Sequence, residues 1–288
     1  MEQINRELKE EQKLTLIQVQ NAALEILKEI SHICEENNLR YFLTYGTLIG
    51  AVRNGGIIPW DDDIDIMMPR PDYNKLVEYF IKNRKKLQPL ELFDNTINSK
   101  YPHIIGRVSD NRFRLNFANE KDYGIGVFVD IYPLDGVGDN YKRAVKLIKK
   151  TKKLASFCFL TSRKHYKRDN TQSLLKMIIK FPAYVIAKIN GNKHYITKLN
   201  KYSDMFDYDS SKYVACLVWP VGKKNGLDRD VFERELFNTK TIMFEDALFN
   251  IPVGYDKFLT VTYGNYMEPL PEKDRKTHHT YDAYSINI

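Results

Sequence analysis

The sequence predicts an α+β fold in which a mixed β-sheet is flanked by helices and interrupted by a basic helical insert. Three observations lead to this expectation. Short β-branched and aromatic runs alternate with longer amphipathic segments, an aspartate-rich loop leads into an apolar run, and residues 141–201 combine a helical pattern with many lysines. We therefore expect one main domain formed by residues 1–140 and 202–288, with residues 141–201 inserted into it.

The periodicity of apolar residues predicts most elements. Residues 12–36 carry apolar side chains at steps of three and four, which is typical of one long amphipathic helix. Strands are expected at 40–45, 64–68, 90–93, 103–108, 113–117 and 126–135, and helices at 48–53, 73–86, 141–162 and 171–189. A kink is expected at Pro182, which lacks a backbone N–H. Residues 243–259 predict a strand, a turn and the beginning of a helix.

Bulk composition favours a reduced, cytoplasmic protein with a large core. The chain has 288 residues, of which 43% are apolar, so one domain with an insert can bury a sizeable core. The N-terminal residues are polar and charged, so no signal peptide is expected. No uncharged apolar run reaches about 18 residues, so no transmembrane helix is expected. Cys34, Cys158 and Cys216 are far apart and lack the spacing of a metal site.

The net charge of +7 conceals a strong asymmetry. Residues 141–201 contain 17 lysines and arginines and one acid, Asp169, whereas the rest of the chain contains 27 basic and 36 acidic residues. A segment with a net charge of +16 in an otherwise acidic protein indicates a polyanionic partner. Its apolar stretch 173–189 fits either a core helix or a helix that lies on an anionic membrane with its lysines reaching outward.

Four aspartates within five residues, Asp61, Asp62, Asp63 and Asp65, form the most informative motif. Their mutual repulsion requires a partner, and a divalent cation is the usual one. Residues two apart on a strand point to the same face, so Asp63 and Asp65 are expected to present two carboxylates together. Mg²⁺ and Mn²⁺ prefer such ligands and share them with substrate phosphates. Asp61 and Asp62 are second-choice ligands; the alternative, a solvated acidic loop, leaves the apolar alternation through Ile64 unexplained.

Asp130 is the third expected metal ligand. It stands within the β-branched run 126–135, where a buried carboxylate has to be paired, ligated or shifted in pKa. The alternative is that Asp130 ends its strand and only caps a turn. Asp135 is a weaker candidate because Leu-Asp-Gly is a good turn sequence.

Phosphate-binding groups are expected on either side of the acidic run. Gly46 allows backbone N–H groups to approach a phosphate, and the hydroxyl of Thr47 can donate to it. Cationic side chains complete such a site because they neutralise phosphate charge, and histidines can also transfer a proton. The candidates are Arg53, Arg107 and Arg275, followed by His278 and His279, for which the alternative is a solvated tail.

The order of these residues resembles known sequence patterns. Gly46-Thr47 followed by Asp-x-Asp at 63–65 is similar to the signature of the nucleotidyltransferase fold. The longer string from Gly-Thr-Leu-Ile-Gly-Ala-Val-Arg to Ile-Pro-Trp-Asp-Asp-Asp-Ile-Asp-Ile more specifically resembles the LicD family. Tyr-Gly-Asn-Tyr-Met at 263–267, Leu-Pro at 270–271 and Arg275 with its two histidines extend the resemblance, although Glu272 replaces the family's second proline. The similarity covers residues 12–135 and 240–280, with little between them.

The LicD resemblance implies a nucleotidyltransferase-like catalytic domain and metal-dependent transfer of phosphocholine, or a related phosphoalcohol, from CDP-choline or another CDP-alcohol. The acceptor would be a hydroxyl of a cell-surface glycan or teichoic-acid precursor, and CMP would leave. Mg²⁺ or Mn²⁺ would bind Asp63, Asp65 and Asp130, with Asp130 or a neighbouring aspartate as base. Trp60, beside the aspartates, would either bind the choline cation on its ring or fill the core.

Other functions are also consistent with the residues. A nucleotidyltransferase would use the same Gly-Thr and Asp-x-Asp apparatus but release pyrophosphate. A nucleic-acid-binding protein built on residues 141–201 is a remote alternative, since no nucleic-acid-binding motif occurs there and no such partner is expected. In the phosphotransferase interpretation the basic segment meets an anionic, lipid-linked acceptor or the inner membrane face, and acceptor use weakens as salt rises.

Overall fold

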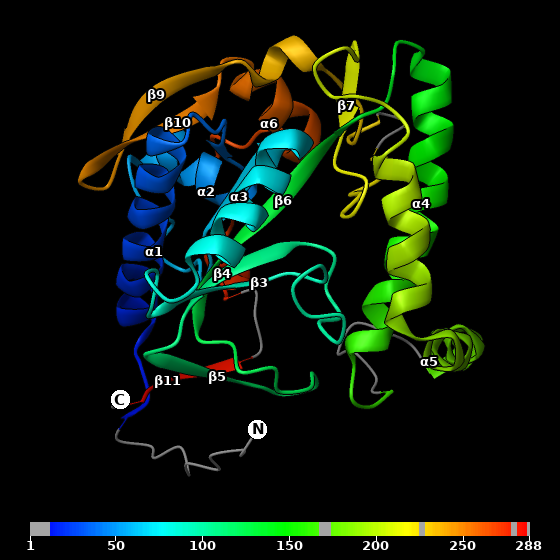
Figure 1. Cartoon of the computed structure of the whole chain (residues 1–288), viewed down its shortest axis with the longest axis horizontal. Coiled ribbons are helices and arrows are strands. Elements are labelled where there is room, and N and C mark those ends of the chain that lie inside the picture. The colour runs from blue at the N-terminus through cyan, green and yellow to red at the C-terminus, as the bar shows by residue number, and fades with distance from the viewer. Residues whose placement is uncertain (1–11, 167–173, 225–227, 278–280, 287–288) are drawn as a thin grey trace.

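The computed structural model describes residues 12–166, 174–224, 228–277 and 281–286, and a mixed sheet lies at its centre (Figure 1). In spatial order the sheet contains β1 (Phe42–Leu43), β2 (Asp65–Pro69), β6 (Val127–Gly136), β4 (Gly106–Asp110) and β3 (Leu90–Phe93). β2 and β6 run parallel, and the other neighbours run antiparallel. Beyond them, β7 (Tyr213–Ala215) pairs with the end of β6, and β8 (Phe232–Glu233) pairs with β7. The predicted mixed sheet is confirmed.

Two helices pack against the central strands. α1 (Leu16–Glu36) begins after Thr15, whose hydroxyl accepts the N–H of Gln18 at 3.4 Å in a capping box. α3 (Arg70–Asn83) follows β2 directly and lies in front of β6 (Figure 1). The apolar faces of both helices join the buried side chains of β1, β2 and β6 in one continuous core.

The Gly-Thr segment forms a short helix. This helix, α2 (Tyr45–Ile49), begins earlier than the expected 48–53 helix and continues as a π-helical turn over Gly50–Asn54. Its beginning is tied to the sheet because the N–H of Thr44 donates to the carbonyl of Asp65 at 3.1 Å. The segment that contains Gly46 and Thr47 is therefore held directly beside the acidic strand.

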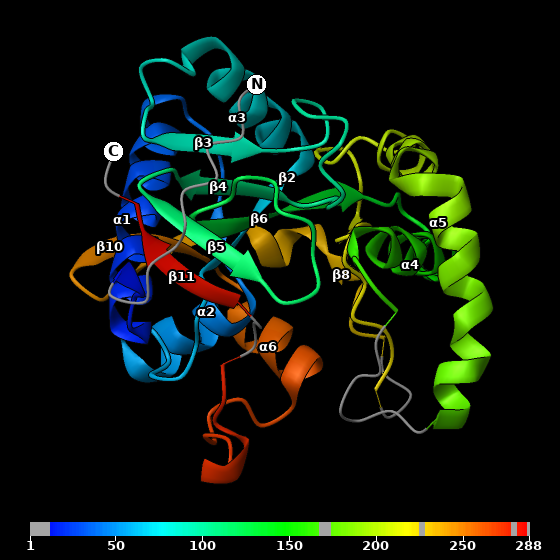
Figure 2. The ribbon, with the colours of Figure 1, turned by 90° about the horizontal axis from the view of Figure 1, so that it is seen from below.

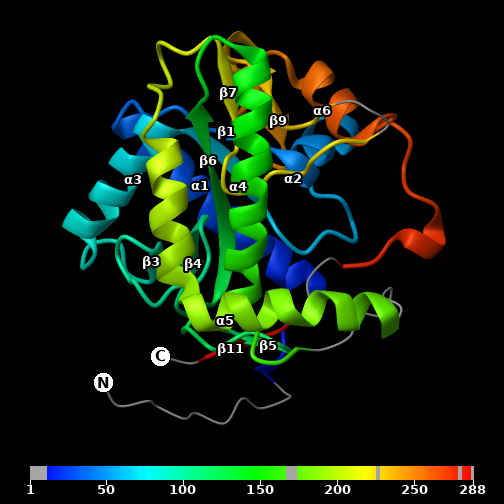
Figure 3. The same ribbon diagram turned by 90° about the vertical axis from the view of Figure 1, so that its right-hand side faces the viewer.

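The basic segment is helical over its described residues, and its second helix is interrupted at a glycine. α4 (Tyr141–Ser162) has the predicted bounds, whereas α5 (Leu174–Ser203) extends beyond the predicted helix. The chain leaves helical geometry at Gly191, with φ +73°, and Pro182 lies inside the first part. Glycine adopts positive φ without steric cost, which explains why the break lies there. Figure 3 shows the two parts of α5 running in clearly different directions.

The last part of the chain forms a hairpin, a helix and a returning strand. β9 (Thr239–Phe244) and β10 (Ala247–Pro252) pair where one strand and a turn were expected, and α6 (Tyr255–Tyr263) follows. β11 (Tyr281–Ser285) pairs antiparallel with β5 (Phe113–Phe117), as Figure 2 shows. Within the described ranges, no helix has both the length and the apolarity that crossing a membrane requires.

Candidate active site

Three neighbouring strands bring Asp65, Asp130 and Arg107 together. Asp65 lies beside Asp130 in the parallel pair of β2 and β6, and Arg107 lies beside Asp130 in the antiparallel pair of β4 and β6. Nε of Arg107 is 2.6 Å from Oδ1 of Asp130, and Nη2 is 3.4 Å from Oδ2. Both side chains are buried, so each charge depends on the other. Asp130 is therefore a mid-strand, ion-paired carboxylate and does not cap a turn.

The guanidinium of Arg107, predicted to bind phosphate, is mostly engaged within the protein. Nε and Nη2 bond Asp130, and Cζ lies 4.2 Å from the centroid of the Phe128 ring. Nη1 is buried and makes no hydrogen bond within the described part of the chain. Arg107 thus orients Asp130, and one of its nitrogens remains as a donor for a ligand.

Asp65 is a buried carboxylate with an incomplete set of partners. Its backbone N–H donates to the hydroxyl of Thr47 at 2.8 Å, so Thr47 holds the start of β2 in place. Its Oδ1 accepts no hydrogen bond from the residues that the structure describes. Burial, followed by the nearby charges of Asp63 and Asp130, raises the pKa of Asp65 well above its usual value. A cation beside Asp65 would stabilise the charged carboxylate and so lower this pKa.

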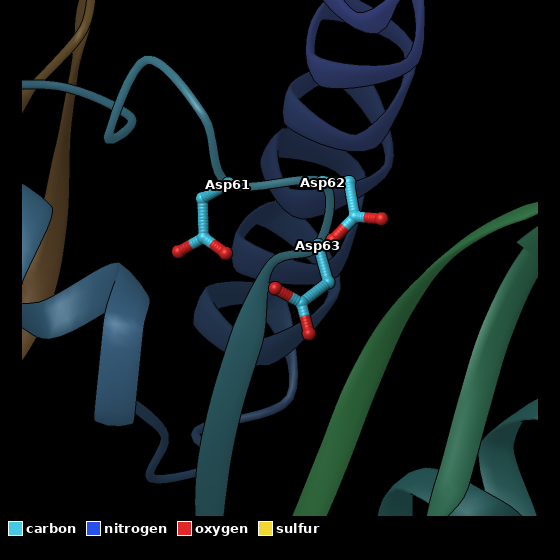
Figure 4. A group of neighbouring side chains, drawn as sticks. All are labelled: Asp61, Asp62 and Asp63. Carbon is cyan, nitrogen blue, oxygen red and sulfur yellow. The ribbon is translucent and has the colours of Figure 1, made fainter. Parts of the chain in front are cut away.

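Asp61, Asp62 and Asp63 lie on the loop that leads into β2 (Figure 4). One carboxylate oxygen from each lies within 4.8 Å of the others. Asp61 and Asp62 are buried, and Asp63 is half-buried. Because β2 begins at Asp65, Asp63 approaches from the loop and not from the strand position that sequence periodicity predicted. The loop therefore adds a compact acidic cluster to the carboxylates of the sheet.

Gly46 lies against this cluster. A Cβ atom at Gly46 would be 2.7 Å from Oδ2 of Asp61, closer than side-chain atoms normally approach. Any larger residue would push the Asp61 carboxylate aside. The glycine of the Gly-Thr pair therefore leaves room for the carboxylate of Asp61 on the acidic loop.

A basic group lies beside the acidic loop. The guanidinium of Arg275 lies over the ring of Trp60, 5.0 Å from Cζ to the ring centroid. Arg53 donates from Nη1 to the carbonyl of Tyr266 at 3.0 Å, and burial followed by the charge of Arg275 lowers the pKa of Arg53. The structure thus brings together Arg53, Trp60 and Arg275, three residues that the sequence nominated separately. Two guanidiniums this close favour an anion between them.

Sequence reasoning assigned no role to two tyrosines at this site. The hydroxyl of Tyr281 donates to the carbonyl of Asp62 at 2.9 Å, and burial and the charge of Asp62 raise its pKa. Burial and the charges of Asp65 and Asp61 raise the pKa of Tyr263. Tyr263 belongs to the Tyr-Gly-x-Tyr-Met string, which was a usable signal, whereas Tyr281 depends on the pairing of β11 with β5. His278 and His279 lie outside the described residues.

Asp135, the weaker sequence candidate, has a structural partner. Its carboxylate is fully buried, and Nε of Arg70 lies 2.6 Å from its Oδ1. The N–H of Leu217 donates to its other oxygen at 3.4 Å. Asp135 therefore fastens α3 and the segment after β7 to β6.

A mixed sheet with carboxylates on adjoining central strands, beside a Gly-Thr segment and an acidic loop, is the architecture expected of a nucleotidyltransferase-like protein. The family described as "LicD/FKTN/FKRP, nucleotidyltransferase domain" matches residues 38–161. A relative that aligns with nearly the whole chain confirms the assignment, and the protein belongs to the LicD family.

That relative is the lipopolysaccharide cholinephosphotransferase LicD of Haemophilus influenzae. It is 30% identical over 276 residues, which are 95% of this chain and 99% of that protein. An uncharacterized protein of Rickettsia typhi is 29% identical over 119 residues, or 40% of this chain and 35% of its own length. One from Rickettsia prowazekii is 44% identical over 48 residues, or 17% of this chain and 18% of its own length.

Proposed function

We propose that the protein transfers phosphocholine, or a related phosphoalcohol, from a CDP-activated donor to a hydroxyl of a cell-surface glycan or teichoic-acid precursor, and that CMP leaves. The similarity to a cholinephosphotransferase over 95% of the chain carries this proposal. The name of that relative gives lipopolysaccharide as its acceptor, so an anionic, lipid-linked glycan is the acceptor class that we propose here.

Mg²⁺ or Mn²⁺ is the proposed cofactor, held first by Asp63, Asp65 and Asp130. The residues fit such an ion because Oδ1 of Asp65 is a buried acceptor with no hydrogen bond within the described residues. Asp61 and Asp62 add oxygens within 4.8 Å of that of Asp63. When bound, the ion would neutralise phosphate charge as a Lewis acid.

The basic group is proposed to bind the donor diphosphate. Burial and, to a smaller extent, the charge of Arg275 lower the pKa of Arg53, and an anion between the two guanidiniums would relieve their repulsion. His278 and His279 follow Arg275 in sequence and are proposed to contact the phosphate or the cytidine. Trp60 borders the same group, but the guanidinium of Arg275 covers one face of its ring.

The proposed reaction is an in-line displacement at the β-phosphorus of the donor. The acceptor hydroxyl oxygen forms a new P–O bond, and the bond from phosphorus to the oxygen shared with CMP breaks. The hydroxyl proton passes to Asp130 or a neighbouring aspartate, and CMP leaves with the bonding electron pair. Arg107 supports this step by fixing the orientation of the Asp130 carboxylate.

The identity of the leaving group tests the proposed function. The protein is incubated with Mn²⁺ or Mg²⁺, purified lipopolysaccharide and CDP-choline, and both CMP and labelled glycan are measured. We expect CMP and labelled glycan in equal amounts. Release of CMP from CDP-ribitol or CDP-glycerol alone would support the same reaction with a different donor. Pyrophosphate from a nucleoside triphosphate, with no CMP from any CDP-alcohol, would establish a nucleotidyltransferase instead.

Peripheral contact with the inner membrane face is proposed through α5. The solvent-facing side of its first part is apolar, with Ile178 65%, Ile179 67%, Phe181 49%, Val185 37%, Ile186 49% and Ile189 78% exposed. These positions recur at helical spacing and form one face. Among the described residues, 141–166 and 174–201 contain no acid, so anionic headgroups would meet no like charge on these helices.

Vesicle binding is expected to depend on this apolar face and on salt. The variant with Ile179→Ser and Ile186→Ser should bind vesicles of phosphatidylglycerol about thirtyfold more weakly than the wild type, because the two exposed side chains together contribute roughly 2 kcal/mol of apolar burial. Leu248→Ser, a substitution at an exposed leucine of β10, is the matched control. Equal losses in both variants, or binding that salt does not weaken, would remove α5 as the membrane contact.

A further inference from the structure

A cavity of about 520 Å³ lies between α4, α5 and residues 218–220. Its walls combine aromatic rings with cations: Phe159, Tyr184 and Trp219, and Lys152, Arg163 and Lys180. No aspartate or glutamate is among the described residues that line it. Lys152 donates to the carbonyl of Val221, next to the lining residue Pro220, at 3.1 Å, so a hydrogen bond positions one of the cations.

The cavity borders the aspartate site through two aromatic side chains. The ring centroid of Trp219 lies 6.1 Å from that of Phe159 in the cavity wall and 6.3 Å from that of Tyr132. Tyr132 follows Asp130 by two positions on β6, so the two side chains share one face of the strand. The ring of Tyr132 therefore links the Trp219 wall of the cavity to the face of β6 that carries Asp130.

Polar contacts also tie the cavity wall to the sheet. Arg163 forms an isolated β-bridge with Glu120, and Oε2 of Glu120 is 3.1 Å from Nε2 of His103. Burial, followed by the charge of Arg107, lowers the pKa of His103. The end of α4 is thus bridged to Glu120, which in turn contacts His103 just before β4.

The charge of the cavity decides which ligand it suits. Lys152, Arg163 and Lys180 give the described lining a positive charge, which repels the quaternary ammonium of choline and favours a phosphate group, even with Glu120 beside Arg163. Aromatic faces beside those cations provide an apolar floor on which the ring of a sugar can lie. A nucleotide would also combine phosphate with a ring, so the two ligands have to be separated by experiment.

We propose that this cavity is the acceptor subsite and that it binds a phosphorylated saccharide through Lys180 and Arg163, with the sugar ring against Trp219. The proposal rests on the proposed transferase function for the identity of the acceptor. It assigns the basic helices a direct part in acceptor selection. The donor is held separately, beside Arg53 and Arg275.

Binding of a defined probe tests the cavity without turnover. The chain contains two tryptophans, so Trp219 is the remaining emitter when Trp60 is replaced by Phe. In that background we expect glucose 1-phosphate to change the emission, and glucose at the same concentration to leave it unchanged. Lys180→Glu should weaken glucose 1-phosphate binding about tenfold, the effect of losing one charge-assisted contact. Lys198→Glu is the matched control because it makes the same charge change at an exposed site on α5 outside the cavity.

Three results would overturn the acceptor subsite. They are equal binding of glucose and glucose 1-phosphate, equal weakening by Lys180→Glu and Lys198→Glu, and competition between CDP-choline and glucose 1-phosphate for the Trp219 signal. The last result would make the cavity a donor site.

Kinetics separates this proposal from the proposed function. With an otherwise wild-type enzyme, Lys180→Glu should raise the KM for lipopolysaccharide about tenfold and leave the KM for CDP-choline unchanged. An unchanged KM for lipopolysaccharide, or a raised KM for CDP-choline, would contradict the subsite. Absence of CMP from the wild type with every CDP-alcohol would refute the transferase function, while the fluorescence measurement would still decide whether the cavity binds a sugar phosphate.

Discussion

Asp65→Asn is expected to lower kcat/KM for CMP release by about a thousandfold or more while leaving the protein folded. The substitution keeps the shape of the side chain and removes the charge that a divalent cation requires. It also relieves repulsion, because Asp65 is buried and its pKa is raised by burial and by Asp63 and Asp130. We therefore expect the melting temperature in EDTA to stay the same or to rise. CMP formation and thermal unfolding, measured on the same preparation, test both parts.

Asp135→Asn is the matched control for this experiment. Asp135 is as deeply buried, but its carboxylate pairs with Arg70. Its loss should lower the melting temperature and leave kcat/KM within about threefold at temperatures where the variant is folded. A thousandfold loss of activity in both variants would show that Asp65 acts through the fold and would contradict its place as a metal ligand.

Mn²⁺ binding provides a readout of Asp65 that does not depend on turnover. A ligand present at 100 times its Kd stabilises the folded state by about 2.7 kcal/mol, which corresponds to a melting-temperature increase of several degrees. The wild type should show this increase with Mn²⁺, and Asp65→Asn and Asp63→Asn should lose most of it. If Mn²⁺ raises the melting temperature of both variants as much as that of the wild type, other carboxylates bind the cation.

Local patterns predicted many of the elements and failed where distant segments decide the geometry. The apolar alternation of β6 and the amphipathic period of α4 are contained in their own residues, so their bounds were close to those predicted. The break of α5 lies at Gly191, just after the predicted end of the helix at 189, and Pro182, where a kink was expected, lies inside the first part of the helix. Thr44, the residue before α2, is held by a hydrogen bond from its N–H to the carbonyl of Asp65 on β2, a contact that no local pattern contains.

The candidate site shows the same division. The acidic run could be predicted because closely spaced aspartates repel one another and require a cation. Asp130 could be predicted because it is a carboxylate within an apolar strand. Their arrangement depends on register: Asp65 adjoins Asp130 only because β2 pairs in parallel with a strand about 60 residues later. Strand register also places Arg107 beside Asp130. Arg107, which was predicted to bind phosphate, therefore forms a buried ion pair.

Arg107→Met is expected to lower the free energy of unfolding by about 3–5 kcal/mol, because it leaves the Asp130 carboxylate buried and uncompensated. The melting temperature should fall by roughly 6–15 °C. Asp130 is 2% exposed and adjoins Asp65 on β2, so neither solvent nor a neighbouring cation replaces the guanidinium within the described residues. Thermal unfolding is measured in EDTA, so that no bound cation offsets the loss of stability.

A double-mutant cycle separates loss of the ion pair from loss of packing against Phe128. Asp130→Asn in the Arg107→Met background removes the stranded charge, so the double variant should be more stable than Arg107→Met alone, with a coupling of about 2–3 kcal/mol. Additive losses would show that packing of the guanidinium on the Phe128 ring, not charge, accounts for the effect. Saturating Mn²⁺ should also reduce the cost of Arg107→Met, because a cation at Asp65 and Asp130 supplies the charge that the arginine provided. If Mn²⁺ leaves that cost unchanged, Asp130 does not belong to the metal site and serves only to anchor β4 to β6.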